Sequence, residues 1–287
     1  DHLEKKSKYT PRQRLWYIRA KEVLLSTGSI ERPIVFGNND TPGVFLSAAA
    51  KEYIKVYGVL VGKKPLIFTN NDSAYETAIE FKKNGVEPLV LDTREDCNSE
   101  LINEAKDLKI DIRFSHAVLA ANGYKKVKSA TIGKLNNDKT DFVSTEIIDC
   151  DCICVSGFWT PTVHLASQSG NKLRFNDEID AFVPDKSKQN ENSIGSSNGT
   201  FTLKETLENS FKLGAEVSNK ITNKNEQILL PKSNERKYST HDKFWCSPLP
   251  RGKNFKRFVD FQNDVAVSDI EVALREGYRS IEHVKRY

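Results

Sequence analysis

PLIFTNNDSAYETAIEFKKNGVEPLVLD, residues 65–92, is the stretch of sequence that decides the fold. It begins with a short, wholly apolar segment over 65–69, which is typical of a strand buried in a parallel sheet. The turn over 70–73 offers residues that can cap a helix, and the pattern predicts that helix over 74–84 and a second apolar strand over 87–91. This strand-helix-strand order predicts a nucleotide-binding type of α/β unit.

The turn after the first strand lacks the glycines of a dinucleotide fingerprint. Asn70 and Asn71 stand there instead and would hold the backbone away from a pyrophosphate. Asp72 would place a negative charge at the helix start, which repels a phosphate. Asp92 does stand about twenty residues on, where a ribose-binding acid is expected. We interpret the unit as one whose nucleotide site has lapsed, with a working NAD site as the open alternative.

The neighbouring segments extend this unit into a two-domain arrangement. We expect helices over 47–57 and 101–108, a strand over 111–114, an antiparallel meander over 117–123, 127–134 and 142–148, and an apolar strand over 151–155 that leads into a glycine turn. The predicted fold class is therefore α/β, with a disulfide-reductase-like flavoprotein architecture. In that architecture two dinucleotide-binding-type domains are interleaved, and the antiparallel meander accompanies the second.

The chain divides into five predicted parts. Residues 1–46 are expected to be the C-terminal part of a first dinucleotide domain, 47–150 an inserted second Rossmann-like domain with the meander, 151–217 the return to the first domain, 218–256 a loop or linker, and 257–287 a strand with helices leading toward a missing C-terminal domain. Within these parts the pattern predicts a hairpin over 171–184 and a helix over 201–213 that Gly214 ends. Because the sequence contains no methionine, we expect a fragment of a longer protein, with a processed mature chain as the alternative.

Composition narrows the classes of function. The 287 residues carry a net charge of +4 with scattered lysines, such as Lys125, Lys126 and Lys128, which favour solvated faces over a nucleic-acid surface. No apolar run reaches the ~18 residues that span a membrane. The five cysteines lack paired spacing, and Cys152 and Cys154 alternate with Cys150 along one expected strand face. We expect them to be small buried hydrophobes in a reducing cytoplasm, with no metal site.

Two segments could approach a dinucleotide. Val23-Leu-Leu-Ser-Thr-Gly28 reads as a strand that ends in small residues, and we expect Thr27 and Gly28 to lie close to a ligand, since a side chain at Gly28 would collide with the ligand or a crossing chain. Ile194-Gly-Ser-Ser-Asn-Gly-Thr-Phe-Thr-Leu203 places a glycine turn before a helix, where backbone N–H groups can meet an anion. Gly195 is the first glycine of that turn. A plain loop-to-helix junction is the alternative.

Several further motifs follow in a fixed order. They are Ser29-Ile-Glu-Arg-Pro33, Asn39-Asp-Thr-Pro-Gly-Val44, Ser156-Gly-Phe-Trp-Thr-Pro-Thr-Val-His-Leu165, Ser167-Gln-Ser-Gly-Asn-Lys-Leu173 and Phe258-Val-Asp-Phe-Gln-Asn-Asp-Val265. Together with the two segments above, they resemble the alpha subunits of heterotetrameric sarcosine oxidase. Phe158 departs from that pattern, because the family has a second glycine there. We expect His164 to be a packed, hydrogen-bonded residue, with a catalytic role as the alternative.

The resemblance implies a set of expectations about function. Ser196, Phe201 and Leu203 would contact NAD in this subunit, and FAD and FMN would lie elsewhere in the assembled complex. The partners would be beta, gamma and delta subunits of a bacterial, cytoplasmic heterotetramer. That complex oxidises sarcosine to glycine, passes the methyl carbon to tetrahydrofolate in one-carbon metabolism and forms hydrogen peroxide. We expect no catalytic residue in this piece, which would be inactive alone. A stand-alone NAD(P)H- or FAD-dependent reductase and a non-catalytic scaffold subunit are the alternatives.

Overall fold

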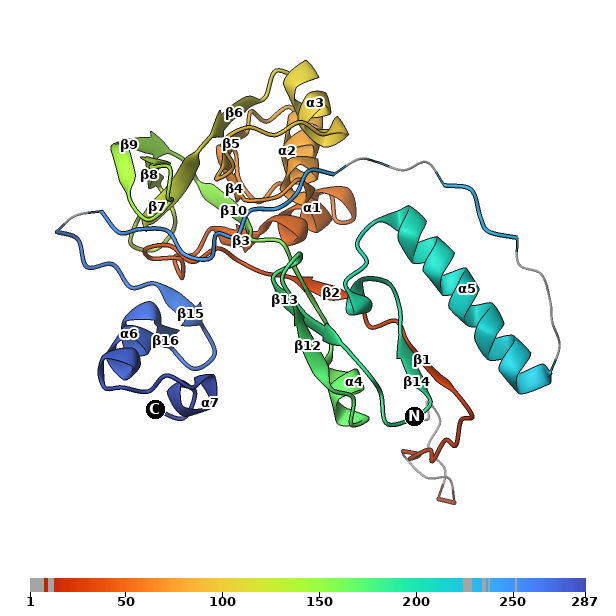
Figure 1. Ribbon diagram of the computed structural model, residues 1–287. Coiled ribbons are helices and arrows are strands. Elements are labelled where there is room, and N and C mark those ends of the chain that lie inside the picture. Colours follow the sequence, from red (N-terminus) through yellow and green to blue (C-terminus); the bar gives the residue numbers. More distant parts are fainter. Residues whose placement is uncertain (1–7, 10–12, 224–228, 234–235, 237, 251) are drawn as a thin grey trace. The chain divides into compact units, whose positions relative to one another are not determined.

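The computed structural model describes residues 8–9, 13–223, 229–233, 236, 238–250 and 252–287 (Figure 1). Backbone contacts divide the chain into two compact units. Unit 1 draws its residues from 1–28, 161–176 and 182–234, and unit 2 from 29–160, 177–181 and 235–287. The chain therefore leaves unit 1, builds most of unit 2, and returns.

Unit 2 is built on a parallel sheet of five strands. In spatial order these are β3 (Val44–Leu46), β10 (Cys152–Ser156), β4 (Pro65–Thr69), β5 (Leu89–Asp92) and β6 (Asp111–Phe114). Strand β4 has all five residues buried, as the apolar run at 65–69 predicts. The predicted strand-helix-strand unit is confirmed, since β4, α2 (Ser73–Lys83) and β5 follow one another and the two strands pair.

Successive residues of these strands face different layers. Ile67, Cys152 and Cys154 lie in one core cluster with α1 (Ser47–Lys55), α2 and α3 (Glu100–Asp107). Leu66, Phe68, Leu91, Ile153 and Val155 lie in a second cluster with the meander. Unit 2 thus has helices on one face of its sheet and a second sheet on the other (Figure 1). All five cysteines are free. Cys150 lies before β10 and packs in the meander cluster, so the prediction that it shares one strand face with Cys152 and Cys154 is wrong.

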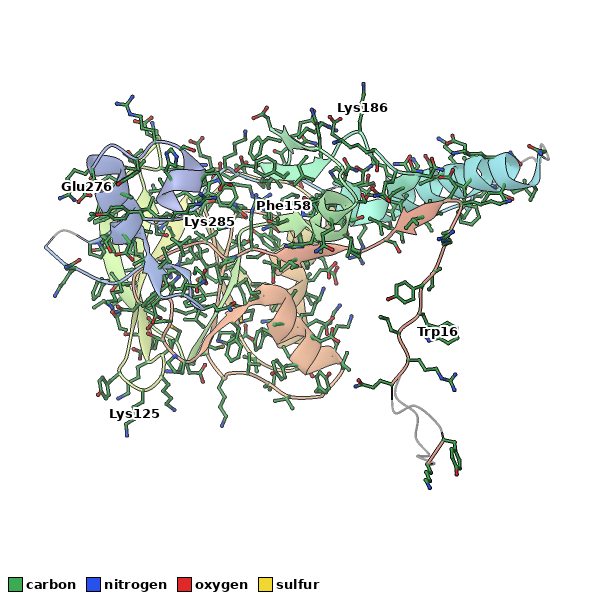
Figure 2. All side chains as sticks on the ribbon, turned by 90° about the horizontal axis from the view of Figure 1, so that it is seen from below. Trp16, Lys125, Phe158, Lys186, Glu276 and Lys285 are labelled. Carbon is green, nitrogen blue, oxygen red and sulfur yellow. The ribbon has the colours of Figure 1, made fainter. Side chains whose placement is uncertain are left out.

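The meander contains β7 (His116–Asn122), β8 (Ser129–Leu135) and β9 (Phe142–Asp149), paired antiparallel in that order as predicted. Lys125 projects from the turn between the first two strands (Figure 2), and Lys126 and Lys128 are also exposed. These lysines are therefore on the solvent-facing side of the turn.

Unit 1 combines two small sheets with helices. Strand β1 (Val23–Leu25) pairs in parallel with β14 (Glu191–Ser193), and β12 (Leu173–Asn176) pairs with β13 (Ala181–Pro184) in the predicted hairpin region. The helical segments are α4 (His164–Gln168), the short 3₁₀ helix η1 (Gly195–Asn198) and α5 (Leu203–Thr222). Helix α5 passes through Gly214, so the prediction that this glycine ends the helix is wrong and the start of the expected 218–256 loop is helical.

Two small sheets and two helices complete the described elements. Strands β2 (Ser29–Glu31) and β11 (Trp159–Pro161) form a two-stranded sheet, and β15 (Phe258–Asp260) with β16 (Val265–Ala266) forms a hairpin before α6 (Val267–Arg275) and α7 (Ile281–Val284). No described helix is both long and apolar enough to cross a membrane. Among the described residues, no three His, Cys, Asp or Glu side chains gather where a metal ion could be held.

Candidate functional site

The two segments predicted to approach a dinucleotide lie at one edge of unit 1. Leu25 is paired with Ser193 in the parallel β1–β14 sheet, so both strands end at the same edge. Thr27 and Gly28 follow the first strand, and Gly195 follows the second. The amide of Ile194 donates to the carbonyl of Leu25 at 2.9 Å, which ties the two strand ends together.

Gly28 adopts a conformation that few other residues tolerate. Its φ is +75°, and a Cβ added there would meet nothing within 4 Å. The crossing chain at Thr162 is present, because Thr162 donates its amide to the Gly28 carbonyl at 3.0 Å and accepts from the Thr27 hydroxyl at 2.8 Å. The expected collision with that crossing chain is nevertheless wrong, so the backbone conformation is the reason for glycine within this chain. The space beside Gly28 stays open.

The turn after β14 is fixed by contacts on both sides. Gly195 has φ of +68°, and the amide of Thr200 returns to its carbonyl at 3.2 Å. Ser197 donates its hydroxyl to the carbonyls of Ile194 and Leu25, at 2.8 and 3.3 Å. The turn that was predicted from Gly195 and Ser196 is therefore held against the end of β1.

Helix α5 begins directly after this turn. The Thr202 hydroxyl accepts from the amide of Glu205 at 3.4 Å and donates to its carboxylate at 2.8 Å, which caps the helix. Leu203 is 64% exposed, and Phe201 is half-buried. A 20-residue helix directs the positive end of its dipole toward this edge, which favours an anion there.

The connection that follows Gly28 contains a feature that sequence reasoning missed. Arg32 in unit 2 donates to the carbonyls of Gly157 and Asp180, at 2.5 and 2.8 Å, and its guanidinium lies 4.1 Å from the ring centroid of Trp245. Phe158, which is labelled in Figure 2, has φ of +80°. Its ring stacks on His241 with ring centroids 4.1 Å apart.

His164 does not occupy the place expected of it. It is exposed at the first residue of α4, so the prediction that it is packed is wrong.

In unit 2, the expected ribose-binding acid Asp92 is fully buried and held by Arg94 at 2.7 Å and by Tyr75 at 2.8 Å. These contacts support the interpretation that the nucleotide site of the complete strand-helix-strand unit has lapsed.

Comparison with solved structures identifies the fold. L-proline dehydrogenase from P. horikoshii aligns with a TM-score of 0.58 at 19% identity, covering 93% of this chain and 48% of that chain. Thioredoxin reductase from T. acidophilum aligns with a TM-score of 0.50 at 17% identity, covering 63% of this chain and 59% of that chain. The fold is therefore that of the disulfide-reductase-like flavoproteins, as the order of elements predicts.

Comparison of sequences gives the closer relationship. Sarcosine oxidase subunit alpha from Corynebacterium sp. (strain P-1) is 32% identical over 287 residues, covering 96% of this chain and 29% of that protein. The subunit alpha from Rhizobium meliloti (strain 1021) is 31% identical over 288 residues, covering 100% of this chain and 28% of that protein. The model of the Sarcosine oxidase A3 domain matches residues 254–287. The chain is thus similar in sequence to sarcosine oxidase alpha subunits over nearly its whole length, which confirms the resemblance, and it spans under a third of the length of those relatives.

Proposed function

We propose that this chain is part of the alpha subunit of a sarcosine oxidase complex. The complex would demethylate sarcosine oxidatively to glycine, as an oxidoreductase acting on a CH–NH donor, with tetrahydrofolate as one-carbon acceptor and hydrogen peroxide as product. NAD would bind in this subunit, and FAD and FMN elsewhere in the assembly with beta, gamma and delta subunits. The support is the homology to proteins named as that subunit. The five free cysteines are consistent with a cytoplasmic location.

The observation that carries the NAD proposal is the shared edge of β1 and β14. Dinucleotides bind at the carboxyl ends of parallel strands, and Thr27-Gly28 and Gly195-Ser196 follow two such ends. The open space beside Gly28 fits NAD, because a ligand can come close to the backbone of a residue that has no side chain.

Each candidate residue would have a binding role. The amides of the Gly195 turn and the start of α5 would face the pyrophosphate, while Phe201 and Leu203 would offer apolar surface beside it. When bound, NAD supplies hydride-transfer chemistry. We assign no catalytic residue to this chain. The exposed apolar side chains of the A3 segment, among them Phe261 and Ile281, would contribute to subunit assembly.

The test is an NAD titration of the full-length alpha subunit by calorimetry, with Gly28→Ala compared to wild type. The new methyl group would occupy the space that the ligand needs, so we expect Kd to rise at least about tenfold. Gly58→Ala is the matched control, because Gly58 also has a positive φ and open space around it but lies in unit 2. An unchanged Kd in Gly28→Ala would remove Gly28 from the site.

The two alternatives predict different outcomes of the same titration. A scaffold subunit would bind no NAD at all. A stand-alone reductase would show reduction of a bound flavin by NADH or NADPH in the isolated subunit. NAD binding without any reduction by sarcosine in the isolated subunit favours the proposed function.

A further inference from the structure

The nucleotide edge of unit 2 is covered by a distant segment of its own chain. Residues 239–247, here called the strap, contain no helix and only an isolated bridge at Cys246. The amide of Asp242 donates to the carbonyl of Asn70 at 2.9 Å, and the Asn70 side chain donates back to the Asp242 carbonyl at 2.7 Å. Thr93 donates its hydroxyl to the Asp242 carboxylate at 3.0 Å. The strap therefore contacts the loops after both β4 and β5, where a dinucleotide would bind.

The strap is anchored along its length. Phe244 is 6% exposed and belongs to the core between the main sheet and the meander. Val35 donates its amide to the Trp245 carbonyl at 2.9 Å and accepts from the Ser247 amide at 2.7 Å. Lys139, at the turn of the meander, lies 2.5 Å from the Asp242 carboxylate. The strap is thus part of the packed unit.

Beneath the strap, Asp92 has no capacity left for a ribose. A carboxylate offers about four lone-pair sites. One oxygen of Asp92 accepts from the Arg94 amide and Nε, at 3.0 and 2.9 Å. The other accepts from Arg94 Nη2 and the Tyr75 hydroxyl, at 2.7 and 2.8 Å.

Arg94 joins this acid to the helix start and to the strap. Its Nη1 donates to Asp72 at 2.8 Å and to the Thr240 carbonyl at 3.2 Å. The second oxygen of Asp72 accepts from the Ser239 amide at 2.6 Å. The side chains of Arg94, Asp72 and Asp92 are 6%, 2% and 0% exposed, so the guanidinium is a buried link between two acids.

We infer that the strap and Arg94 replace a dinucleotide at this edge, so that unit 2 is permanently closed to nucleotides and serves as a rigid structural body. Three acids (Asp72, Asp92 and Asp242) stand at this edge and are paired with Arg94 and Lys139, so the two bases are already engaged by carboxylates and are not free to bind a pyrophosphate. The inference does not depend on whether unit 1 binds NAD.

The first test removes the guanidinium group of Arg94 by mutation and then adds free guanidinium ion to the variant. Arg94→Ala leaves two buried carboxylates around a space of guanidinium shape, and we expect the thermal midpoint to fall by roughly 6–20 °C. Low millimolar guanidinium chloride should raise that midpoint in a saturable way, while sodium chloride at the same concentration should not.

The matched control is Arg113→Ala. Arg113 also contacts two acids, Asp111 and Glu146, but its side chain is 32% exposed. Guanidinium should rescue neither this variant nor wild type. A midpoint of Arg94→Ala equal to that of wild type, or a folded Arg94→Ala variant that guanidinium does not rescue, would overturn the inference.

A second measurement covers the case in which Arg94→Ala does not fold. Hydrogen exchange of the full chain is followed with and without millimolar AMP and NAD, in wild type and in Asp242→Asn. We expect neither nucleotide to change the protection of residues 69–75 and 89–95 in wild type. Nucleotide-dependent protection there would show that the strap yields to a ligand, and the inference would fail even if NAD also bound unit 1.

Discussion

Among single residues, Glu31 has an environment that its sequence position does not reveal. It is 5% exposed, and its carboxylate accepts from the amide of Ala48 at the start of α1, at 2.7 Å. Burial raises the pKa of Glu31 from 4.5 to about 7, against the lowering effects of the Ala48 amide and the Ser156 hydroxyl. The carboxyl group therefore holds a proton in the folded chain at pH values where the unfolded chain has lost it.

This difference makes stability depend on pH. Between pH 4.5 and about 7 the folded state binds more protons than the unfolded state, so the free energy of unfolding falls as pH rises through that window. Glu31→Gln should remove this fall and be more stable than wild type at pH 8 by roughly 1–3 kcal/mol. Urea unfolding at pH 5, 6, 7 and 8 measures both slopes, with the exposed Glu52→Gln as control. Parallel curves for wild type and Glu31→Gln would contradict the assignment.

Phe158 gives a second prediction at this scale, because its backbone and its side chain make opposite demands. The φ of +80° favours glycine, whereas the stack on His241 needs an aromatic ring. Phe158→Ala loses the ring and keeps the strain, so it should destabilise by about 3 kcal/mol. Phe158→Gly should recover about 1–2 kcal/mol of that loss. Chemical denaturation of the two variants side by side measures which of them is more stable. If Phe158→Ala were more stable than Phe158→Gly, the backbone at this position would not be strained.

At the scale of elements, α5 shows that a glycine in the sequence does not always mark the end of a helix. Gly214 was expected to stop the helix, but no contact requires a stop there, and an added Cβ would meet nothing within 4 Å. Gly214→Ala should therefore stabilise unit 1 by roughly 0.5–1 kcal/mol, because alanine loses less backbone entropy in a helix. Gly85→Ala is the opposite control, since Gly85 follows α2 with φ of +78° and should lose about 1 kcal/mol. Thermal melts of both variants provide the comparison.

The elements that sequence reasoning located best are those with a long local pattern. The strands over 65–69 and 111–114 were predicted to the residue, because a contiguous apolar run or a clear turn marks where each strand begins and ends. Four three-residue strands, β2, β3, β11 and β14, were missed, because so short a segment has no period to detect. The candidate site depends on β14, so its two motifs could be proposed separately while the pairing that joins them could not.

At the scale of the whole chain, the interleaving of segments was the hardest feature to predict. The order of parallel strands and meander indicated a domain inserted into another, whereas unit 2 combines residues 29–160 with 177–181 and the C-terminal segment 235–287. The strap lies in the predicted 218–256 linker, whose apolar residues show no periodic pattern, yet Phe244 and Ser247 are buried. Its contacts are backbone hydrogen bonds to loops more than a hundred residues away, such as Asp242 to Asn70, which no local pattern records.

The amides of the strap should consequently be among the slowly exchanging ones of the chain. Those of Asp242 and Ser247 donate to Asn70 and Val35, at 2.9 and 2.7 Å, in a segment that packs into the core of unit 2. Since opening them requires release of Phe244, we expect exchange at least about a thousandfold slower than at Leu229, which is 92% exposed. Residue-resolved hydrogen exchange by NMR provides the measurement, with the β4 amide of Phe68 as the protected reference. If Asp242 and Ser247 exchanged as fast as Leu229 while Phe68 stayed protected, the strap would open on its own, and unit 2 would consist of a stable sheet with a separable cover.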